Sequence, residues 1–184
     1  MSVHYPKLPE KIFFFISGAI ISTPFPALVN AIALYFLSVN FSEYTAFLIA
    51  AAIIAPFVEE FAKSYPLFYR HGETERSIFS LGFLTGLGFG IAEFFLYVFL
   101  LGAPAILRLP LILFHATNTT ITAYGIGRNK ALYFFLIAVL LHFSYNLFLL
   151  SDGIFVYLSI VPAFASFGLS LFLYRRTRQE YYEE

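Results

Sequence analysis

The chain has 184 residues, of which 60% are apolar, 21% are aromatic and 12% are charged. Lys and Arg balance Asp and Glu at 11 each, and the chain contains no cysteine. This composition indicates a multi-pass membrane protein and excludes disulfides and thiolate chemistry. The formal charge of zero gives no sign of a nucleic-acid partner.

Long apolar segments fill most of the chain. A helix that crosses a bilayer needs about 20 apolar residues. Six segments meet this requirement and are joined by short connections: 12–38, 44–69, 77–101, 104–126, 131–150 and 154–174. They predict an all-α polytopic membrane helix bundle of about six transmembrane helices, forming one domain over residues 1–184. In the first segment, Pro24 and Pro26 predict a kink or a break.

Positive charge is confined to alternate connections. Nine of the eleven Lys and Arg residues lie before the first segment, between the second and third, between the fourth and fifth, or after the sixth. The opposite connections carry Glu43 and Asp152 and no basic residue. Since cytoplasmic loops retain Lys and Arg, we expect a protein of the cell membrane with both termini in the cytoplasm.

Two adjacent acids interrupt the second segment. Pro56 lacks an amide hydrogen, so we expect the carbonyl of Ala52 to be unpaired and the helix to bend one turn before Glu59 and Glu60. Lys63 lies within helical reach of either carboxylate. Because adjacent helical residues point about 100° apart, at most one glutamate can face a shared centre, and the other supports it.

A structural alternative is a pair of carboxylates that reach the membrane surface with Lys63 as counter-ion. Glu60 is nine residues from Tyr69, which corresponds to about 14 Å of helix inside a hydrocarbon core of about 30 Å. Reaching the surface from that depth is difficult, so the pair is more consistent with a working cavity.

The third segment contains glycine at every fourth position, at Gly82, Gly86 and Gly90. Such a stripe is typical of close helix packing. Glu93 lies three residues beyond Gly90 on the same face, and close packing would bury this acid without a partner unless it served a polar site.

The fourth and fifth segments each carry one polar stripe at helical spacing. The stripes consist of His115, Asn118, Thr119 and Thr122, and of His142, Tyr145 and Asn146. A single histidine in a membrane helix more often makes an interhelical hydrogen bond. Two histidines at matching depth, beside three acids, favour a shared functional site.

The order of these motifs resembles the PrsW family of intramembrane proteases, in the clan that contains the CAAX-processing and bacteriocin-processing enzymes. The matching residues are Glu59, Glu60 and Lys63; Gly86, Gly88, Gly90 and Glu93; His115 and Thr119; and His142 and Asn146. In the CAAX-processing branch the second motif usually ends in His. Glu93 at that position therefore favours the PrsW branch.

The resemblance implies cleavage of a peptide bond at or within the bilayer. Its implied partner is a membrane-protein substrate, such as the single-span anti-sigma factors that PrsW relatives cleave. By analogy with the family, Glu59 would take a proton from water while Glu60 orients it, and His115, His142 and Asn146 would bind or polarise the scissile carbonyl.

A divalent metal such as Zn²⁺ is an open alternative to this metal-free mechanism. The candidate ligands are the two histidines together with one or two of the three glutamates: Glu59, Glu60, Glu93, His115 and His142. The chain has no His-Glu-x-x-His helix, so the common zincin arrangement is excluded. Lys63, Glu93 and Thr119 would support the site.

Two other classes of function fit buried Glu and His side chains. One is a proton-coupled membrane transporter, and the other is a binding or scaffold protein without catalysis. The segments show no inverted repeat, and their polar residues occupy four consecutive segments instead of matching positions in two halves. A protease is therefore the preferred interpretation.

Overall fold

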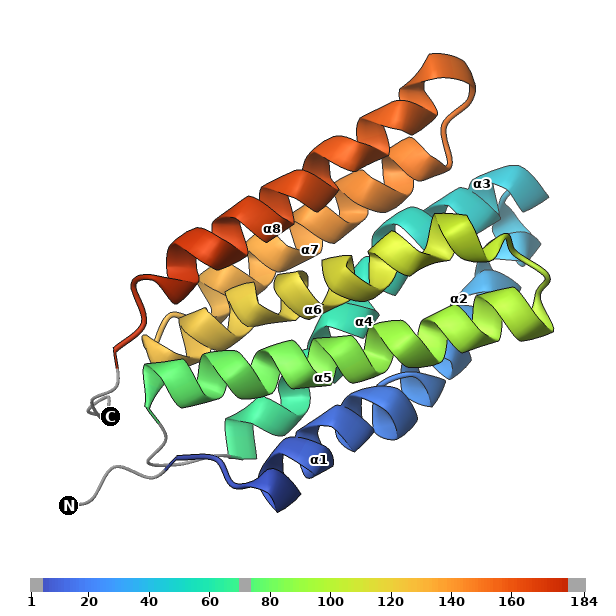
Figure 1. Ribbon diagram of the computed structural model, residues 1–184. Coiled ribbons are helices and arrows are strands. Elements are labelled where there is room, and N and C mark those ends of the chain that lie inside the picture. Colours follow the sequence, from blue (N-terminus) through green and yellow to red (C-terminus); the bar gives the residue numbers. More distant parts are fainter. Residues whose placement is uncertain (1–4, 70–73, 179–184) are drawn as a thin grey trace.

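The computed structural model describes residues 5–69 and 74–178, and every regular element in these ranges is helical (Figure 1). The α-helices are α1 (Leu8–Ile16), α2 (Pro24–Asn40), α3 (Glu43–Leu48), α4 (Ala55–Ser64), α5 (Glu75–Phe95), α6 (Ala105–Gly127), α7 (Ala131–Leu149) and α8 (Ile160–Tyr174). The π-helical segments η1 (Ser17–Ile21), η2 (Ile49–Ile54) and η4 (Leu96–Leu100) follow α1, α3 and α5. The 3-10 helices are η3 (Tyr65–Tyr69) and η5 (Gly153–Ser159).

Joined end to end, these elements give five described segments that are long and apolar enough to cross a membrane. They are Leu8–Asn40, Glu43–Tyr69, Glu75–Leu100, Ala131–Leu149 and Gly153–Tyr174. These segments correspond to five of the six predicted spans and confirm the all-α polytopic bundle. Arg70, in the second basic connection, lies outside the described residues.

The remaining predicted span, 104–126, is helical as α6 but is not among the five apolar segments. Its hydropathy is lowered by the polar stripe that contains His115. Protein takes the place of lipid around the second half of this helix, because every residue from Phe114 to Gly127 is buried, whereas Ile106, Leu107 and Leu109 in its first half are exposed. Helices α5, α7 and α8 pack against it, and α6 lies between α5 and α7 in Figure 1. It is the central helix of the bundle.

The first predicted span is broken into two pieces. Helix α1 and segment η1 end at Ile21, and α2 begins at Pro24, so the expected effect of the prolines is confirmed. At the break, the hydroxyl of Ser22 donates to the carbonyl of Ala62 at 3.0 Å. This bond attaches the broken segment to α4.

The glycine stripe of α5 packs on α6, as the spacing predicted. A Cβ atom at Gly86 would overlap the carbonyl oxygen of His115, and one at Gly90 would lie 2.8 Å from the Cα of Ile112. Only hydrogen fits at these positions, so the two backbones approach closely. This close approach brings Glu93, one turn farther along α5, beside His115.

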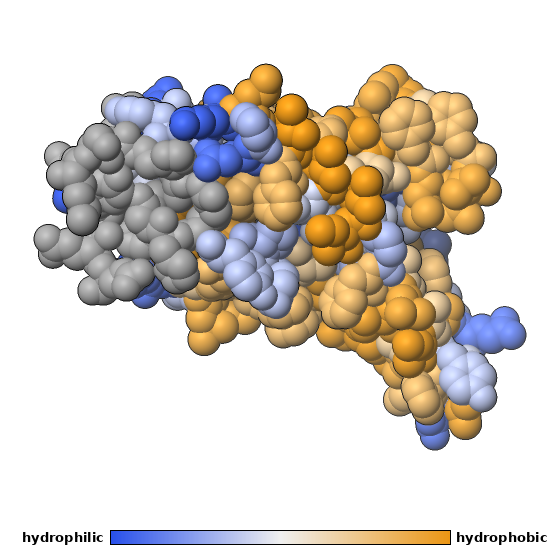
Figure 2. Space-filling view, turned by 90° about the horizontal axis from the view of Figure 1, so that it is seen from below, coloured by the Kyte–Doolittle hydropathy of each residue, from blue (hydrophilic) through white to orange (hydrophobic). Residues whose placement is uncertain are grey.

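Three of the predicted basic connections meet at one end of the bundle. The guanidinium of Arg128 donates to the carbonyl of Arg176 at 3.0 Å, and the amide of Arg178 donates to the carboxylate of Glu75 at 2.8 Å. Figure 2 shows apolar side chains along the flank, with polar side chains nearer the ends. Which end faces the cytoplasm stays a prediction.

Candidate active site

The paired glutamates of α4 point into the centre of the bundle. Glu59 is 9% exposed, and neither Glu60 nor Lys63 is exposed at all. Charged side chains are rarely buried so completely unless they are paired. The partners of these three residues therefore define the site.

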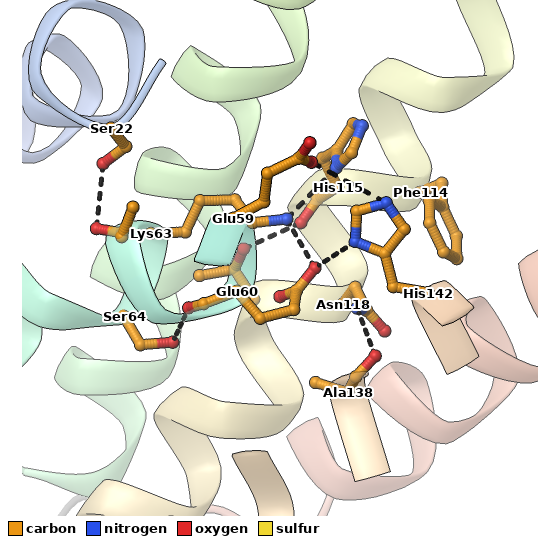
Figure 3. Close-up of polar contacts among 12 residues, drawn as sticks. Ser22, Glu59, Glu60, Lys63, Ser64, Phe114, His115, Asn118, Ala138 and His142 are labelled. Carbon is orange, nitrogen blue, oxygen red and sulfur yellow. Dashed lines mark hydrogen bonds and ion pairs between the residues drawn. The ribbon is translucent and has the colours of Figure 1, made fainter. Parts of the chain in front are cut away.

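Glu60 accepts hydrogen bonds from two directions (Figure 3). Its Oε1 atom lies 2.6 Å from Nζ of Lys63, one turn along α4, and 2.8 Å from Nδ1 of His142 on α7. The Lys63 ammonium compensates the carboxylate charge in the low-dielectric interior. Glu60 is thus a fixed anchor between two helices.

This anchor determines the tautomer of His142. A carboxylate only accepts hydrogen bonds, so Nδ1 of His142 carries the hydrogen and Nε2 keeps its lone pair. Nε2 lies 3.7 Å from Oε2 of Glu59, which is too long for a direct hydrogen bond. Oε2 of Glu59 is buried and has no hydrogen-bond partner among the described residues. A water molecule or a metal ion placed here would satisfy both atoms.

His115 on α6 faces the same space from the other side. Its Nε2 atom lies 2.6 Å from Oε2 of Glu93, and its Nδ1 atom lies 3.1 Å from Nζ of Lys63. The centroids of the two imidazole rings are 5.2 Å apart. The structure therefore brings together all five predicted acids and histidines.

Access to the cluster is uneven. The side chains of Glu59 and Glu93 are 12% and 15% exposed, whereas the side chain of Glu60 is not exposed. Phe89 packs on His115 at 4.9 Å, and Phe114 packs on His142 at 5.5 Å between ring centroids. These aromatic walls leave Glu59 and Glu93 as the reachable acids.

The other two predicted site residues lie beside this cluster. Thr119 donates its hydroxyl to the carbonyl of His115 at 2.9 Å, where α6 meets the glycine stripe. Asn146 donates its amide to the carbonyl of Ala51 at 2.9 Å. The carbonyl expected to be freed by Pro56 was that of Ala52, and the observed acceptor is one residue earlier.

Sequence reasoning did not single out Arg108 and Tyr97. The Arg108 guanidinium lies 3.6 Å from the centroid of the Tyr97 ring. Arg108 precedes His115 by seven residues and Tyr97 follows Glu93 by four, so both extend the polar faces of α5 and α6. The sequence signal that could have identified this pair is the charged Arg108 inside an otherwise apolar segment.

The residues present fit a divalent metal ion. Glu59, His115 and His142 each offer one ligand atom, and these atoms lie within 4.8 Å of one another. Carboxylate and imidazole are the ligands that Zn²⁺ takes in catalytic sites. Nε2 of His115 is close to Glu93, but like Oε2 of Glu59 it makes no well-directed hydrogen bond to the described residues. His142 also has the carboxylate partner that metal-bound histidines usually have.

The contact between Lys63 and His115 favours the metal-free form instead. A Lys63 ammonium donates to Nδ1 of His115 and leaves the ring hydrogen on Nε2, facing Glu93. Binding a metal through Nε2 would require the hydrogen on Nδ1. The two forms therefore differ in where one proton resides.

Comparisons with known proteins agree with this geometry. The sequence profile of PrsW family intramembrane metalloproteases matches residues 9–170 of the 184, which include every residue of the cluster. Neither curated proteins nor solved structures gave a match. The chain belongs to the PrsW family of intramembrane metalloproteases.

Proposed function

We propose that this chain is an intramembrane endopeptidase that hydrolyses one peptide bond of a single-span membrane protein, with Glu59 acting on the attacking water. The main support is the convergence of Glu59, His115 and His142, whose donor atoms lie within 4.8 Å of one another. They meet inside a helix bundle of a protease family.

Glu59 suits the role of general base better than Glu60. A base needs a carboxylate that can reach water. The Oε2 atoms of both glutamates lack a hydrogen-bond partner among the described residues, but the side chain of Glu59 is 12% exposed and that of Glu60 is not exposed. Glu60 is closed off and already bonded to Lys63 and His142. In this proposal Glu59 takes a proton from water and returns it to the leaving amine.

Glu60 would act through His142. Its bond to Nδ1 keeps the lone pair of His142 on Nε2, on the side of Glu59. That lone pair accepts a hydrogen bond from the attacking water and orients it. Lys63 compensates the charge of Glu60, which keeps the carboxylate ionised.

His115, which lies beside Glu93, would bind the carbonyl group of the substrate. With Lys63 at Nδ1, the ring of His115 presents an N–H group at Nε2. This donor polarises the scissile carbonyl and stabilises the developing oxyanion. Glu93 lies 2.6 Å from the same Nε2 atom, so the substrate carbonyl would replace the Glu93 carboxylate as the acceptor of this hydrogen.

If a divalent metal such as Zn²⁺ is bound, Glu59, His115 and His142 would hold it. The metal would supply Lewis-acid polarisation and a stronger water nucleophile. Glu60, bonded to Nδ1 of His142, would then orient that ring from outside the ligand set.

The proposed substrate is a single-span protein of the anti-sigma-factor type. Membership of the PrsW family supports this choice, because a site built between membrane-spanning helices is reached by a substrate within the same bilayer. The substrate sequence and the bond cleaved would be identified by mass spectrometry of the products.

The test uses the full chain in liposomes with a panel of synthetic single-span peptides. We expect cleavage by the unmodified chain, and a loss of at least about 100-fold in Glu59→Gln. Asp152→Asn, which removes a carboxylate from the exposed loop before η5, is the matched control and should retain activity. Wild-type activity in Glu59→Gln would overturn the proposal.

The same preparation distinguishes the other function classes. Proton flux across the liposome membrane that needs Glu59, without peptide cleavage, would identify a transporter. Peptide binding without turnover would identify a scaffold. Cleavage that persists after chelation, in protein shown to be free of metal, would select the metal-free mechanism.

A further inference from the structure

We propose that Asn146 is a positioning residue, which holds the acid-bearing helix against α7 by capping the carbonyl of Ala51 that Pro56 leaves without a helical partner. This inference deepens the proposed function and assigns Asn146 a role other than contact with the substrate. It rests on the juxtaposition of Asn146, Ala51 and Pro56.

The backbone hydrogen bonding of η2 is interrupted at Pro56. The amide of Ala55 donates to the carbonyl of Ala50, five residues back, as in a π-helix. Continuing this spacing, the amide of residue 56 would serve the carbonyl of Ala51. Residue 56 is proline, which has no amide hydrogen. The carbonyl of Ala51 therefore lacks its helical donor.

Asn146 supplies a replacement donor. The amide nitrogen of Asn146 lies 2.9 Å from the carbonyl oxygen of Ala51. A carbonyl can only accept, so the NH₂ group of Asn146 must face it. Inside a membrane no bulk water would satisfy this carbonyl otherwise, and an unpaired one is costly.

This bond joins the same two helical segments that carry His142 and the paired glutamates. Asn146 follows His142 by four residues on α7, and Ala51 precedes Glu59 by eight residues in the η2–α4 rod. The same two rods are joined a second time by His142 and Glu60 at 2.8 Å. The two bonds together fix the rotation and the separation of these rods.

Apolar packing alone would not fix the rotation and the separation of the two rods. An apolar groove of about 440 Å³ opens between the rods, and the ring contact of Phe57 with Phe135 at 5.3 Å fills only part of the space between them. Its lining residues are Ile53, Ile54, Phe57, Val58, Leu136, Val139, Leu140 and Phe143. The two polar bonds therefore contribute to the separation of the rods in a way that apolar contacts alone do not.

A double-mutant cycle between Asn146→Ala and Pro56→Ala tests the proposal. With Pro56 present, Asn146→Ala leaves the Ala51 carbonyl unpaired, and cleavage of a single-span peptide should fall about tenfold or more. In the Pro56→Ala background, a backbone amide can serve the η2 carbonyls, so Asn146→Ala should cost about threefold or less. Equal losses in both backgrounds would overturn the proposal.

Asn118→Ala is the matched control. Asn118 donates its amide to the carbonyl of Ala138 at 2.9 Å, so it makes the same type of interhelical bond at the same distance. Ala138 lies inside the regular helix α7, far in sequence from Pro56. The effect of Asn118→Ala should therefore be the same with and without Pro56→Ala.

A second readout does not depend on proteolysis. The chain has no cysteine, so nitroxide labels can be attached at Phe68→Cys and Leu132→Cys, two exposed positions in η3, which directly follows α4, and on α7. Asn146→Ala should broaden the label-to-label distance distribution, and adding Pro56→Ala should narrow it again. An unchanged distribution would overturn the positioning role, whereas absent cleavage with the expected broadening would reject only the protease assignment.

Discussion

Lys63 and Glu60 form an ion pair of 2.6 Å in which neither side chain is exposed. Removing one partner from a buried pair leaves an uncompensated charge. We expect Lys63→Met to lower the free energy of unfolding by about 3–5 kcal/mol. Thermal unfolding in detergent micelles measures this loss, and Glu60→Gln together with Lys63→Met should recover part of it. A double variant less stable than Lys63→Met would contradict this account.

Glu60→Gln separates orientation from catalysis. A glutamine can present either its carbonyl or its amide to Nδ1 of His142, so the tautomer is no longer fixed. We expect cleavage to fall about 10–100-fold, less than in Glu59→Gln. The rates of both variants on one synthetic single-span peptide decide the order. A greater loss in Glu60→Gln would exchange the roles of the two acids.

Gly86→Ala tests the approach of α5 to α6. The added methyl group would overlap the carbonyl of His115, so the helices must separate and Glu93 moves away from the ring. We expect a destabilisation of about 1–3 kcal/mol and a large loss of cleavage. Gly168→Ala on α8 is the control, because a Cβ atom there meets nothing within 4 Å. Equal effects at both positions would refute the packing argument.

Metal removal tests the ligand set. If Zn²⁺ is bound, the purified chain should carry it, and His115→Ala or His142→Ala should each weaken the affinity by at least about tenfold. Atomic absorption and competition with a chelating dye give stoichiometry and affinity. Asp152→Asn should bind as the unmodified chain does. Full activity in a metal-free chain would exclude the metal mechanism and leave the glutamate mechanism as the remaining one.

Much of the bundle was predictable from hydropathy. Apolar length identified the spans, and Pro24 and Pro26 located the break that follows η1. The π-helical segments were not predictable, because apolar periodicity in runs such as Ile49–Ile54 does not distinguish five-residue from four-residue hydrogen bonding. For this reason the freed carbonyl was placed at Ala52 and not at Ala51.

The residues that form the site were predictable from the sequence, but the pairs that they form were not. Buried acids and histidines at matching depth predicted the cluster of Glu59, Glu60, Glu93, His115 and His142. Helical spacing allowed Lys63 to reach either acid, and the structure pairs it with Glu60, whose Oε1 also binds His142 of α7. The partner of Asn146 likewise depends on a contact between distant parts of the chain.

The enclosed second half of α6 has a consequence for membrane insertion during synthesis. A segment that carries His115, Asn118 and a row of threonines would partition poorly into lipid when it leaves the translocon alone. Its neighbours α5 and α7 come directly before and after it in synthesis. We therefore expect it to wait at the translocon and enter the bilayer as part of a helical hairpin.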